Sequence, residues 1–319
     1  EIGWPVHVHA VPGSWPRPDG ASFATLDDAV ERIPDDAVVL LDGLVASTAP
    51  EVLVPQASRL RLVTLVHMPL GHGTADGDAR TREGAVLSAA ASVVTTSAWS
   101  RGTLLELYSL PGDRVHVAEP GVDAAGLASG TETAGALLCV AAVIPGKGHD
   151  VLLDALATMT DLSWDCLCVG SLDRDPAFAE SLRRRLLDDG IGDRVRFPGP
   201  RIGGDLDRSY VSADLLVLAS RAETYGMVVT EALARGLPVV AADVGGVAEA
   251  LGHGAGGIRP GLLVPPDDPA ALAAALRAWL GDAELRLAWR QAARERRESL
   301  SRWSTTTSVL AGVLAGAAR

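Results

Sequence analysis

The most informative stretch of the chain is residues 220–249, which read SRAETYGMVVTEALARGLPVVAADVGGVAE. An apolar run at residues 215–219 precedes this stretch and predicts a buried strand that ends at Ser220. A polar loop carrying Glu223 then leads to Gly226, and a helix is predicted directly after this glycine. Ligands of open α/β sheets bind at the carboxyl ends of the strands, so this strand, loop and helix predict a binding site.

The start of the predicted helix is suited to an anion. Gly226 allows the backbone to approach a ligand closely, and the N–H groups of Gly226, Met227 and Val228 have no partner within the helix. The helix dipole adds to the attraction. Glu231 lies about one turn into the helix, where its carboxylate can accept two hydroxyl groups of a ribose. Glu223 lies outside the helix. If the anion is a phosphate group, Glu223 can face the part of the ligand that is attached beyond it.

Apolar runs alternate with helical segments along the chain, which predicts an α/β protein made of two Rossmann-like halves. Many of the runs are unbroken, as in parallel strands that are covered on both faces. Strands are predicted in the first half at residues 6–10, 38–41, 60–66, 92–96 and 115–118. In the second half they are predicted at residues 137–142, 165–170, 194–197, 215–219, 239–242 and 262–264.

Small and polar residues at 124–135, AAGLASGTETAG, mark the boundary between the halves. We therefore expect an N-terminal domain at residues 1–124 and a C-terminal domain at residues 125–303, with a helix at residues 304–319 that packs back on the first. A dinucleotide-type half normally opens with a strand and a glycine-rich turn. No such turn precedes residues 6–10, so we expect the first β–α unit of the N-terminal domain to be absent from this sequence.

The composition narrows the possible partners and the cellular compartment. With 28 Lys and Arg against 40 Asp and Glu, the 319 residues carry a net charge of −12, which argues against nucleic acid and disfavours, without excluding, a membrane surface. Three cysteines cannot all pair, and Cys166 and Cys168 lie in an apolar run, so we expect core thiols in a reducing cytoplasm. No apolar run reaches the ~20 residues of a membrane span, and no signal peptide is expected.

Residues 220–249 resemble the donor-binding motif of the GT-B fold, family 4 (retaining) glycosyltransferases, E-x-F-G-x-x-x-x-E-A-x-A-x-G-x-P-V-V-A-x-x-x-G-G-x-x-E. The resemblance implies two Rossmann-like domains that face each other across a cleft. It also implies transfer of a sugar from a nucleotide diphosphate sugar to an acceptor hydroxyl, with retention of configuration. The matching residues, with Tyr225 in place of phenylalanine, are Glu223, Gly226, Glu231, Ala232, Ala234, Gly236, Pro238, Val239, Gly245, Gly246 and Glu249.

A second resemblance lies at residues 140–149, VAAVIPGKGH, which match the family pattern V-G-R-L-x-x-x-K-G. In the family, the arginine and the lysine of this pattern clamp the donor diphosphate. Lys147 matches the lysine and is the only lysine of the chain, whereas Ala142 stands at the position of the arginine. Arg201 and Arg221 are the candidates to replace that arginine.

Three further segments resemble the family upstream of this turn. LVHMP at residues 65–69 is similar to the strand end that places a histidine, here His67, near the donor sugar. SVVTTS at residues 92–97 resembles the next strand and ends at Ser97, a predicted N-cap. EPGVD at residues 119–123 is similar to the P-x-G-V-D that precedes the interdomain linker.

The resemblance implies a role for each site residue. Lys147 and the helix N-terminus would stabilise the leaving diphosphate without a metal or another cofactor, and Glu223 would hold the donor sugar. Glu231 would bind the ribose, and His67 would approach the sugar and a small-molecule or glycan acceptor. Further donor contacts are expected from Gly226, Met227, Val228, Tyr225, Thr224, Ser220, Arg201 and Gly146.

Two alternatives remain open at this point. The first is a nucleotide-sugar-binding subunit with impaired catalysis, which Ala142 favours. The second, less favoured, is a nucleotide-sugar epimerase of the GT-B fold.

Two patterns typical of metal sites have simpler interpretations. His7 and His9 have the spacing of zinc ligands, but no third ligand lies nearby, so we expect a solvent-facing strand edge. Asp173 and Asp175 form a D-x-D pattern directly before a proline, which predicts a capped helix start.

Overall fold

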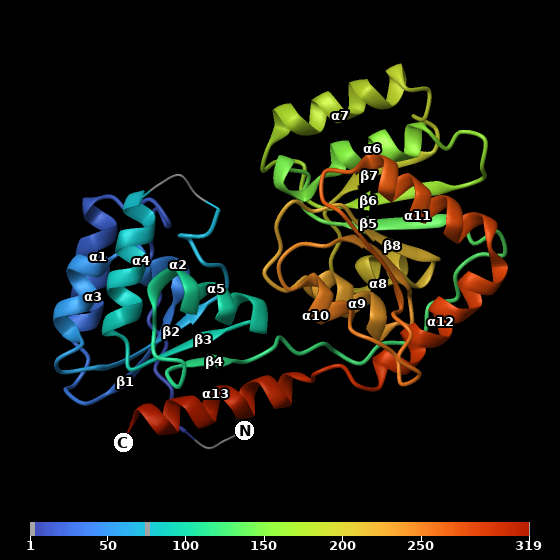
Figure 1. Cartoon of the computed structure of the whole chain (residues 1–319). Coiled ribbons are helices and arrows are strands. Elements are labelled where there is room, and N and C mark those ends of the chain that lie inside the picture. The colour runs from blue at the N-terminus through green and yellow to red at the C-terminus, as the bar shows by residue number, and fades with distance from the viewer. Residues whose placement is uncertain (1–3, 74–76, 319) are drawn as a thin grey trace. The chain divides into compact units, whose positions relative to one another are not determined.

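The computed structural model describes residues 4–73 and 77–318, and the chain divides into two compact units. Unit 1 comprises Glu1–Gly121 and Arg302–Arg319, and unit 2 comprises Val122–Ser301. Each unit contains one parallel sheet with helices packed against it (Figure 1). The ranges that we expected for the two domains from the sequence end a few residues later than these units do.

The sheet of unit 1 has four parallel strands in the order β1-β2-β3-β4. Leu41, Leu53 and Leu62 belong to one core of this unit, and Val63 and Val94 belong to another, which includes Val313 of α13. The helix α13 thus packs on the strands β1 to β3, although it follows unit 2 in the sequence (Figure 1). The elements of unit 1 are α1 (Gly20–Glu31), β1 (Val38–Asp42), α2 (Gly43–Ala46), α3 (Pro50–Gln56), β2 (Arg61–Val66), α4 (Gly77–Ala89), β3 (Ser92–Thr95), α5 (Ala98–Tyr108), β4 (Val115–Val117) and α13 (Trp303–Ala317).

The sheet of unit 2 has six parallel strands in the order β10-β9-β8-β5-β6-β7, and helices cover both of its faces (Figure 1). Its strands are β5 (Ala136–Val140), β6 (Asp165–Val169), β7 (Val195–Gly199), β8 (Leu215–Leu218), β9 (Val239–Ala242) and β10 (Gly261–Val264). Its helices are η1 (Pro145–Lys147), α6 (His149–Ala157), α7 (Pro176–Asp188), α8 (Gly203–Val211), α9 (Met227–Ala234), α10 (Val247–Leu251), α11 (Pro269–Gly281) and α12 (Ala283–Arg297).

Both faces of the six-stranded sheet are buried, which explains the unbroken apolar runs in the sequence. All four residues of β8 and all four of β9 are buried. Along β8, Leu215 and Val217 pack with helices α6, α7 and α11, while Leu216 and Leu218 pack with helices α8, α9 and α10. Successive side chains of a strand point to opposite faces, so each residue of such a strand must be apolar.

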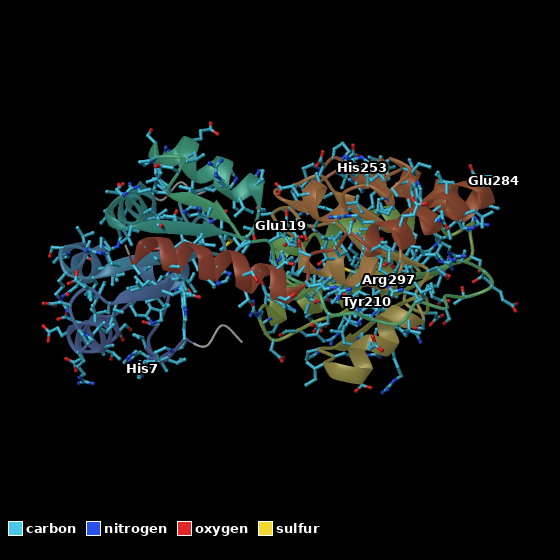
Figure 2. The ribbon with its side chains drawn as sticks, turned by 90° about the horizontal axis from the view of Figure 1, so that it is seen from below. His7, Glu119, Tyr210, His253, Glu284 and Arg297 are labelled. Atoms are coloured by element: carbon cyan, nitrogen blue, oxygen red, sulfur yellow. The ribbon has the colours of Figure 1, made fainter. Side chains whose placement is uncertain are left out.

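Ten of the eleven predicted strands are present, and the strand predicted at residues 6–10 is wrong. Val6 and Val8 are 75% and 89% exposed, and the described sheets contain no strand that pairs with this segment. Alternation of valine with histidine produces a β-like pattern, but a strand requires a neighbour for its backbone hydrogen bonds. His7 and His9 are exposed, as expected, but they lie on an irregular segment rather than on a strand edge (His7 is labelled in Figure 2).

The predicted helix starts are confirmed by their capping geometry. Asp175 accepts a hydrogen bond from the Phe178 N–H at 2.9 Å, with Pro176 in the first turn of α7. Ser97 accepts from the Ser100 N–H at 3.0 Å at the start of α5. Side-chain caps of this kind satisfy N–H groups that have no partner within the helix.

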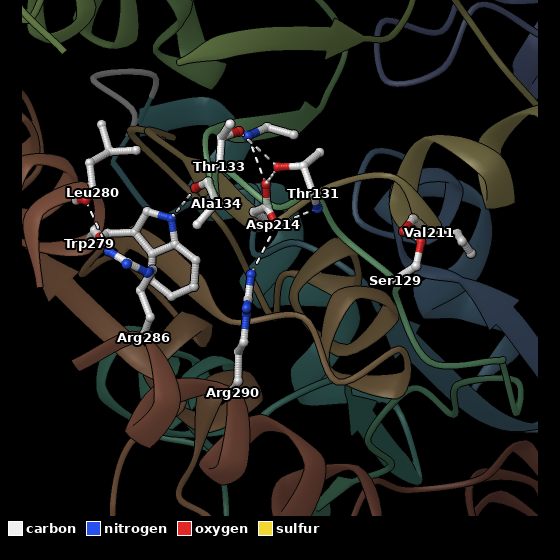
Figure 3. Close-up of polar contacts among 11 residues, drawn as sticks. Ser129, Thr131, Thr133, Ala134, Val211, Asp214, Trp279, Leu280, Arg286 and Arg290 are labelled. Carbon is white, nitrogen blue, oxygen red and sulfur yellow. Dashed lines mark hydrogen bonds and ion pairs between the residues drawn. The ribbon is translucent and has the colours of Figure 1, made fainter. Parts of the chain in front are cut away.

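A buried carboxylate anchors the segment that leads into unit 2 (Figure 3). Asp214, directly before β8, accepts hydrogen bonds from the Thr131 and Ala136 N–H groups at 2.9 Å and from the Thr131 hydroxyl at 2.5 Å. Arg290 of α12 forms an ion pair with the same carboxylate at 2.9 Å. These contacts lie at the amino ends of β5 and β8, the end of the sheet opposite the predicted site, so we assign Asp214 to stability.

Candidate functional site

Two loops of unit 2 meet at the carboxyl ends of β5 and β8, which are neighbours in the sheet. The turn after β5 carries Lys147, and the loop after β8 carries Glu223. The Lys147 Nζ lies 2.6 Å from the Glu223 Oε1, and the Ser220 hydroxyl donates to the same oxygen at 2.8 Å. The Lys147 and Glu223 side chains are 28% and 13% exposed. The structure therefore brings together two residues, 76 positions apart in the chain, that the sequence singled out separately.

Arg221 ties the same two loops together and is already neutralised. Its N–H donates to the Gly146 carbonyl at 2.9 Å, and its guanidinium also donates to the Pro145 carbonyl. The guanidinium binds both carboxylate oxygens of Asp150, at 3.0 and 2.8 Å, and lies 2.6 Å from the Asp267 Oδ1. Hydrogen bonding to Asp150 raises the pKa of Arg221 above its ordinary value. This pairing argues against Arg221 as the replacement for the arginine that Ala142 lacks.

Arg201 remains a candidate for that role. It follows β7, the edge strand that is separated from β5 by β6, so it lies at the same end of the sheet as Lys147. Its Nη1 donates a hydrogen bond to the Ser209 hydroxyl at 2.9 Å, and no described carboxylate forms an ion pair with it. Its charge is therefore available to a ligand.

Two glycines allow the loops of the site to approach each other. Gly148 has φ +65°, and a Cβ there would lie 1.9 Å from the Ala219 carbonyl oxygen. Gly245 has φ +56°, and a Cβ there would lie 1.5 Å from the Glu223 carbonyl oxygen. Both contacts are far shorter than van der Waals distance, so only glycine permits this backbone path beside Lys147 and Glu223.

The helix α9 begins at Met227, as predicted, directly after Gly226 with φ +90°. Within the described part of the chain, the N–H groups of Met227 and Val228 have no hydrogen-bond acceptor. These donors and the helix dipole suit an anion beside Lys147. Tyr225, expected among the donor contacts, is only 3% exposed and packs in the core of unit 2. Its side chain therefore anchors the loop between β8 and α9 on the core.

Glu231 is positioned by a tyrosine that the sequence analysis did not single out. The hydroxyl of Tyr210, on α8, donates to the Glu231 Oε2 at 2.6 Å, and the Arg235 guanidinium lies over the Tyr210 ring at 4.6 Å (Tyr210 is labelled in Figure 2). Burial and the charge of Glu231 raise the pKa of Tyr210. The hydrogen bond holds one oxygen of Glu231 and leaves the other for a ligand. No motif surrounds Tyr210, and only the packing of the helices reveals this pair.

His67 lies in unit 1, after β2. Its Nε2 is 3.6 Å from the Oδ2 of Asp42, the last residue of the neighbouring strand β1. The two side chains are 56% and 53% exposed, so this histidine presents its ring to solvent at the carboxyl end of its sheet. The position agrees with the predicted strand end. All the other predicted site residues lie in unit 2.

The loop that follows His67 is held by a buried carboxylate that was also missed. Glu83 of α4 is fully buried and accepts hydrogen bonds from the Leu70 and Gly71 N–H groups at 3.0 and 2.9 Å. The hydroxyls of Ser47 and Tyr108 donate to it at 3.0 and 2.6 Å. Burial and the hydrogen bond to Glu83 raise the pKa of Tyr108. The sequence around Glu83 is that of an exposed helix, and no local signal marks this residue as an anchor.

The described residues contain one group of three candidate metal ligands, Cys139, His149 and Cys168. This group is buried in the core of unit 2, and none of its members takes part in the ion pair of Lys147 with Glu223. His253 is exposed on a loop (Figure 2). None of the described helices is both long and apolar enough to cross a bilayer.

Comparison with known proteins identifies relatives of this chain. Residues 130–296 match the family model described as Glycosyl transferases group 1. The D-inositol 3-phosphate glycosyltransferase of Jonesia denitrificans is 34% identical over 246 residues, which are 71% of this chain and 57% of that protein. D-inositol 3-phosphate glycosyltransferase 1 of Catenulispora acidiphila is 34% identical over 261 residues, which are 75% of this chain and 61% of that protein. The chain thus spans about three fifths of the length of these relatives.

Solved structures agree on the fold. HepE of Anabaena, in complex with UDP and glucose, matches with a TM-score of 0.75 and 20% identity, over 92% of this chain and 81% of HepE. Sucrose-phosphate synthase of Thermosynechococcus elongatus matches with a TM-score of 0.76 and 23% identity, over 93% of this chain and 79% of that protein. The two parallel α/β units are therefore those of the GT-B fold, as expected from the sequence. Since the family model covers more than half of the chain, the protein belongs to the group 1 glycosyl transferases.

Proposed function

We propose that this chain is a retaining glycosyltransferase of family 4, which transfers a sugar from a nucleotide diphosphate sugar to an acceptor hydroxyl. The observation that carries the proposal is the convergence of Lys147 and Glu223 beside the N-terminus of α9. A lysine and free N–H groups suit a diphosphate, and a carboxylate beside them suits the hydroxyls of the attached sugar. Family membership independently supports glycosyl transfer.

In this mechanism the protein stabilises the leaving group. Negative charge grows on the diphosphate as the bond to the sugar breaks, and Lys147 with the N–H groups of Met227 and Val228 would stabilise it. The acceptor would attack from the same face, and the leaving phosphate would take its proton, so no separate base is needed. Glu223, oriented by the Ser220 hydroxyl, would hold the sugar hydroxyls.

The remaining contacts would position the donor and the acceptor. Glu231, with one oxygen held by Tyr210, would accept the ribose hydroxyls on its other oxygen. His67 would approach the sugar and the acceptor, as the resemblance to the family implies. The buried Glu83 would keep the loop after His67 in place.

The relatives indicate which substrates should be tested first. The solved complexes of HepE contain UDP and UDP-glucose, so we propose UDP sugars as the first donors. The names of the curated relatives specify inositol 3-phosphate, so we propose a phosphorylated polyol as the first acceptor. A cytoplasmic location is consistent with three unpaired, buried thiols. A thermal-shift screen tests the donors, because a ligand at 100 times its Kd stabilises the folded state by ~2.7 kcal/mol.

A donor-binding protein without transferase activity is the second candidate. Ala142 leaves the diphosphate with one cation fewer than the family pattern has, and Arg221 is paired with Asp150 and Asp267. Donor turnover with and without an acceptor separates the candidates. A transferase needs the acceptor, an epimerase of the same fold does not, and a binding protein consumes no donor in either case.

Replacing Glu231 with alanine is expected to weaken the binding of free UDP by about 1.5–3 kcal/mol, because hydrogen bonds from the ribose to a charged group are lost. Glu223→Ala is expected to affect UDP binding less, since its carboxylate would face the sugar, although turnover should fall sharply in both variants. Isothermal titration calorimetry with UDP measures the difference. Glu284→Ala, on the exposed surface of α12, is the matched control. Unchanged affinity in Glu231→Ala would place the ribose elsewhere.

Transfer is expected to continue in excess EDTA, because Lys147 and the start of α9 provide the positive charge that a divalent cation would otherwise supply. Asp173→Ala combined with Asp175→Ala should cost about 0.5–2 kcal/mol of stability, the value of a helix cap, and leave turnover near that of the wild type. Initial rates with EDTA, and after addition of Mg²⁺ or Mn²⁺, are the measurement. Loss with EDTA and recovery with either ion would mean that a cation replaces the missing arginine.

A further inference from the structure

Three thiols and an imidazole lie together in the core of unit 2. Cys139 of β5 and Cys168 of β6 are opposite each other in the parallel register, and His149, the first residue of α6, reaches the same place. The Cys139 Sγ lies 3.7 Å from the His149 Nε2, and the ligand atoms of these three residues all lie within 4.8 Å of one another. Cys166, two residues before Cys168, places its Sγ 3.8 Å from the Cys168 Sγ. All four side chains are at most 1% exposed.

Packing alone does not account for His149. Its Nδ1 has no hydrogen-bond partner among the described residues, and its Nε2 faces the sulfur atom of Cys139. The ring otherwise faces Phe197, with the ring centroids 6.2 Å apart. A buried polar group is normally hydrogen-bonded, and the nitrogen placed to bind an ion beside the sulfur atoms is Nε2.

The donor atoms indicate the chemical class of that ligand. Sulfur and imidazole nitrogen are soft or borderline ligands, which suit Zn²⁺ or Cu⁺ and disfavour Mg²⁺ and Ca²⁺. With Zn–S about 2.3 Å and Zn–N about 2.0–2.1 Å, the edges of a tetrahedral zinc site measure about 3.6–3.8 Å. The distance of 3.7 Å between the Cys139 Sγ and the His149 Nε2 is close to such an edge, and the other ligand atoms lie within 4.8 Å. Two thiolates also neutralise a divalent ion, which makes its burial in an apolar core acceptable.

We propose that Cys139, His149 and Cys168 bind a thiophilic d¹⁰ cation, with Zn²⁺ as the first ion to test, and that Cys166 lies beside this site without belonging to it. The site joins β5, β6 and the start of α6. His149 is two positions after Lys147, at the start of α6, so the site lies beneath the turn after β5 without contacting the lysine side chain. The site is a structural one and is distinct from the diphosphate contacts, so it does not depend on the proposed transfer reaction.

The test uses the full chain without an affinity tag, prepared free of metal and titrated with Co²⁺. We expect thiolate-to-cobalt charge-transfer absorption that saturates at one ion per chain and disappears when Zn²⁺ displaces the cobalt. Cys139→Ser, Cys168→Ser and His149→Gln should each abolish this absorption or weaken affinity by more than ~100-fold, while Cys166→Ser should weaken it less. His253→Gln, a histidine on an exposed loop, is the matched control and should bind as the wild type does.

A second measurement needs no variant and so remains valid if a core substitution prevents folding. Zn²⁺ should slow alkylation of Cys139 and Cys168 in the wild-type protein, as followed by mass spectrometry, and should raise its Tm. The proposal is overturned if the wild type shows no charge-transfer absorption, if Cys139→Ser and Cys168→Ser bind Co²⁺ normally, or if oxidation of the protein as purified joins Cys139 to Cys168. The cobalt spectrum reports ion binding by the thiols. The EDTA experiment instead reports a cation at the diphosphate, through recovery of transfer by Mg²⁺ or Mn²⁺, so the two proposals can fail independently.

Discussion

Lys147→Ala is expected to lower the rate of sugar transfer by about 10²–10³-fold, by analogy with the loss of one oxyanion donor in other enzymes. Lys147 is the only side-chain cation that pairs with Glu223 at the edge of β5 and β8 in the described chain, and no arginine at position 142 can replace it. Stability should fall by only about 1 kcal/mol, because the pair is partly open to solvent and screened.

Steady-state kinetics with UDP-sugar donors measure this effect, and thermal unfolding measures the change in stability. Lys147→Arg keeps the charge and is expected to retain more activity than Lys147→Ala. The rate of transfer by Arg201→Ala is measured for comparison, because Arg201 is the other candidate cation for the diphosphate. A rate loss below tenfold in Lys147→Ala, together with a large loss in Arg201→Ala, would move the diphosphate clamp to Arg201.

Asp214→Ala is expected to lower the free energy of unfolding of unit 2 by about 3 kcal/mol, the second large effect. The Asp214 side chain is fully buried, and its removal leaves two backbone N–H groups, the Thr131 hydroxyl and the Arg290 guanidinium without their acceptor (Figure 3). Removal of one member of a buried ion pair costs 3–5 kcal/mol, and the partial exposure of Arg290, at 35%, places this case at the lower end.

Urea unfolding followed by tryptophan fluorescence measures this loss, because Trp164, Trp279 and Trp289 are buried in unit 2. Asp205→Ala is the matched control, since this carboxylate is 65% exposed and pairs only with Arg208 on the surface of α8. It should change stability by less than about 1 kcal/mol. Turnover per folded molecule should remain near that of the wild type in both variants. A loss below 1 kcal/mol in Asp214→Ala would mean that the segment entering unit 2 finds other partners.

Much of the fold could be predicted because its signals are local. The four consecutive apolar residues of β8 and of β9 are readable as strands, since a strand covered on both faces needs no polar residue. Capping is equally local, and Ser97 and Asp175 end up at the predicted helix starts. The site followed from the same logic, because the motifs place Lys147 and Glu223 after strands that are neighbours in the sheet.

The failures have one physical cause, which is that each depends on contacts between distant residues. The segment at residues 6–10 has a strand-like pattern, but no strand of the described sheets pairs with its backbone. Glu83 and Asp214 look like ordinary surface charges, and only packing buries them beside several donors. Tyr210 likewise becomes a partner of Glu231 only when α8 lies beside α9.

The sequence alone determined the α/β class, the parallel strands and the residues with the chemistry of a diphosphate site, because hydrophobic pattern, glycine spacing and capping act over a few residues. Tertiary structure decided which charges neutralise each other. It pairs Lys147 with Glu223, commits Arg221 to Asp150 and Asp267, and gathers Cys139, Cys168 and His149 into one buried cluster. Charge pairing and burial depend on distances between segments far apart in the chain, and only the folded sheet sets those distances.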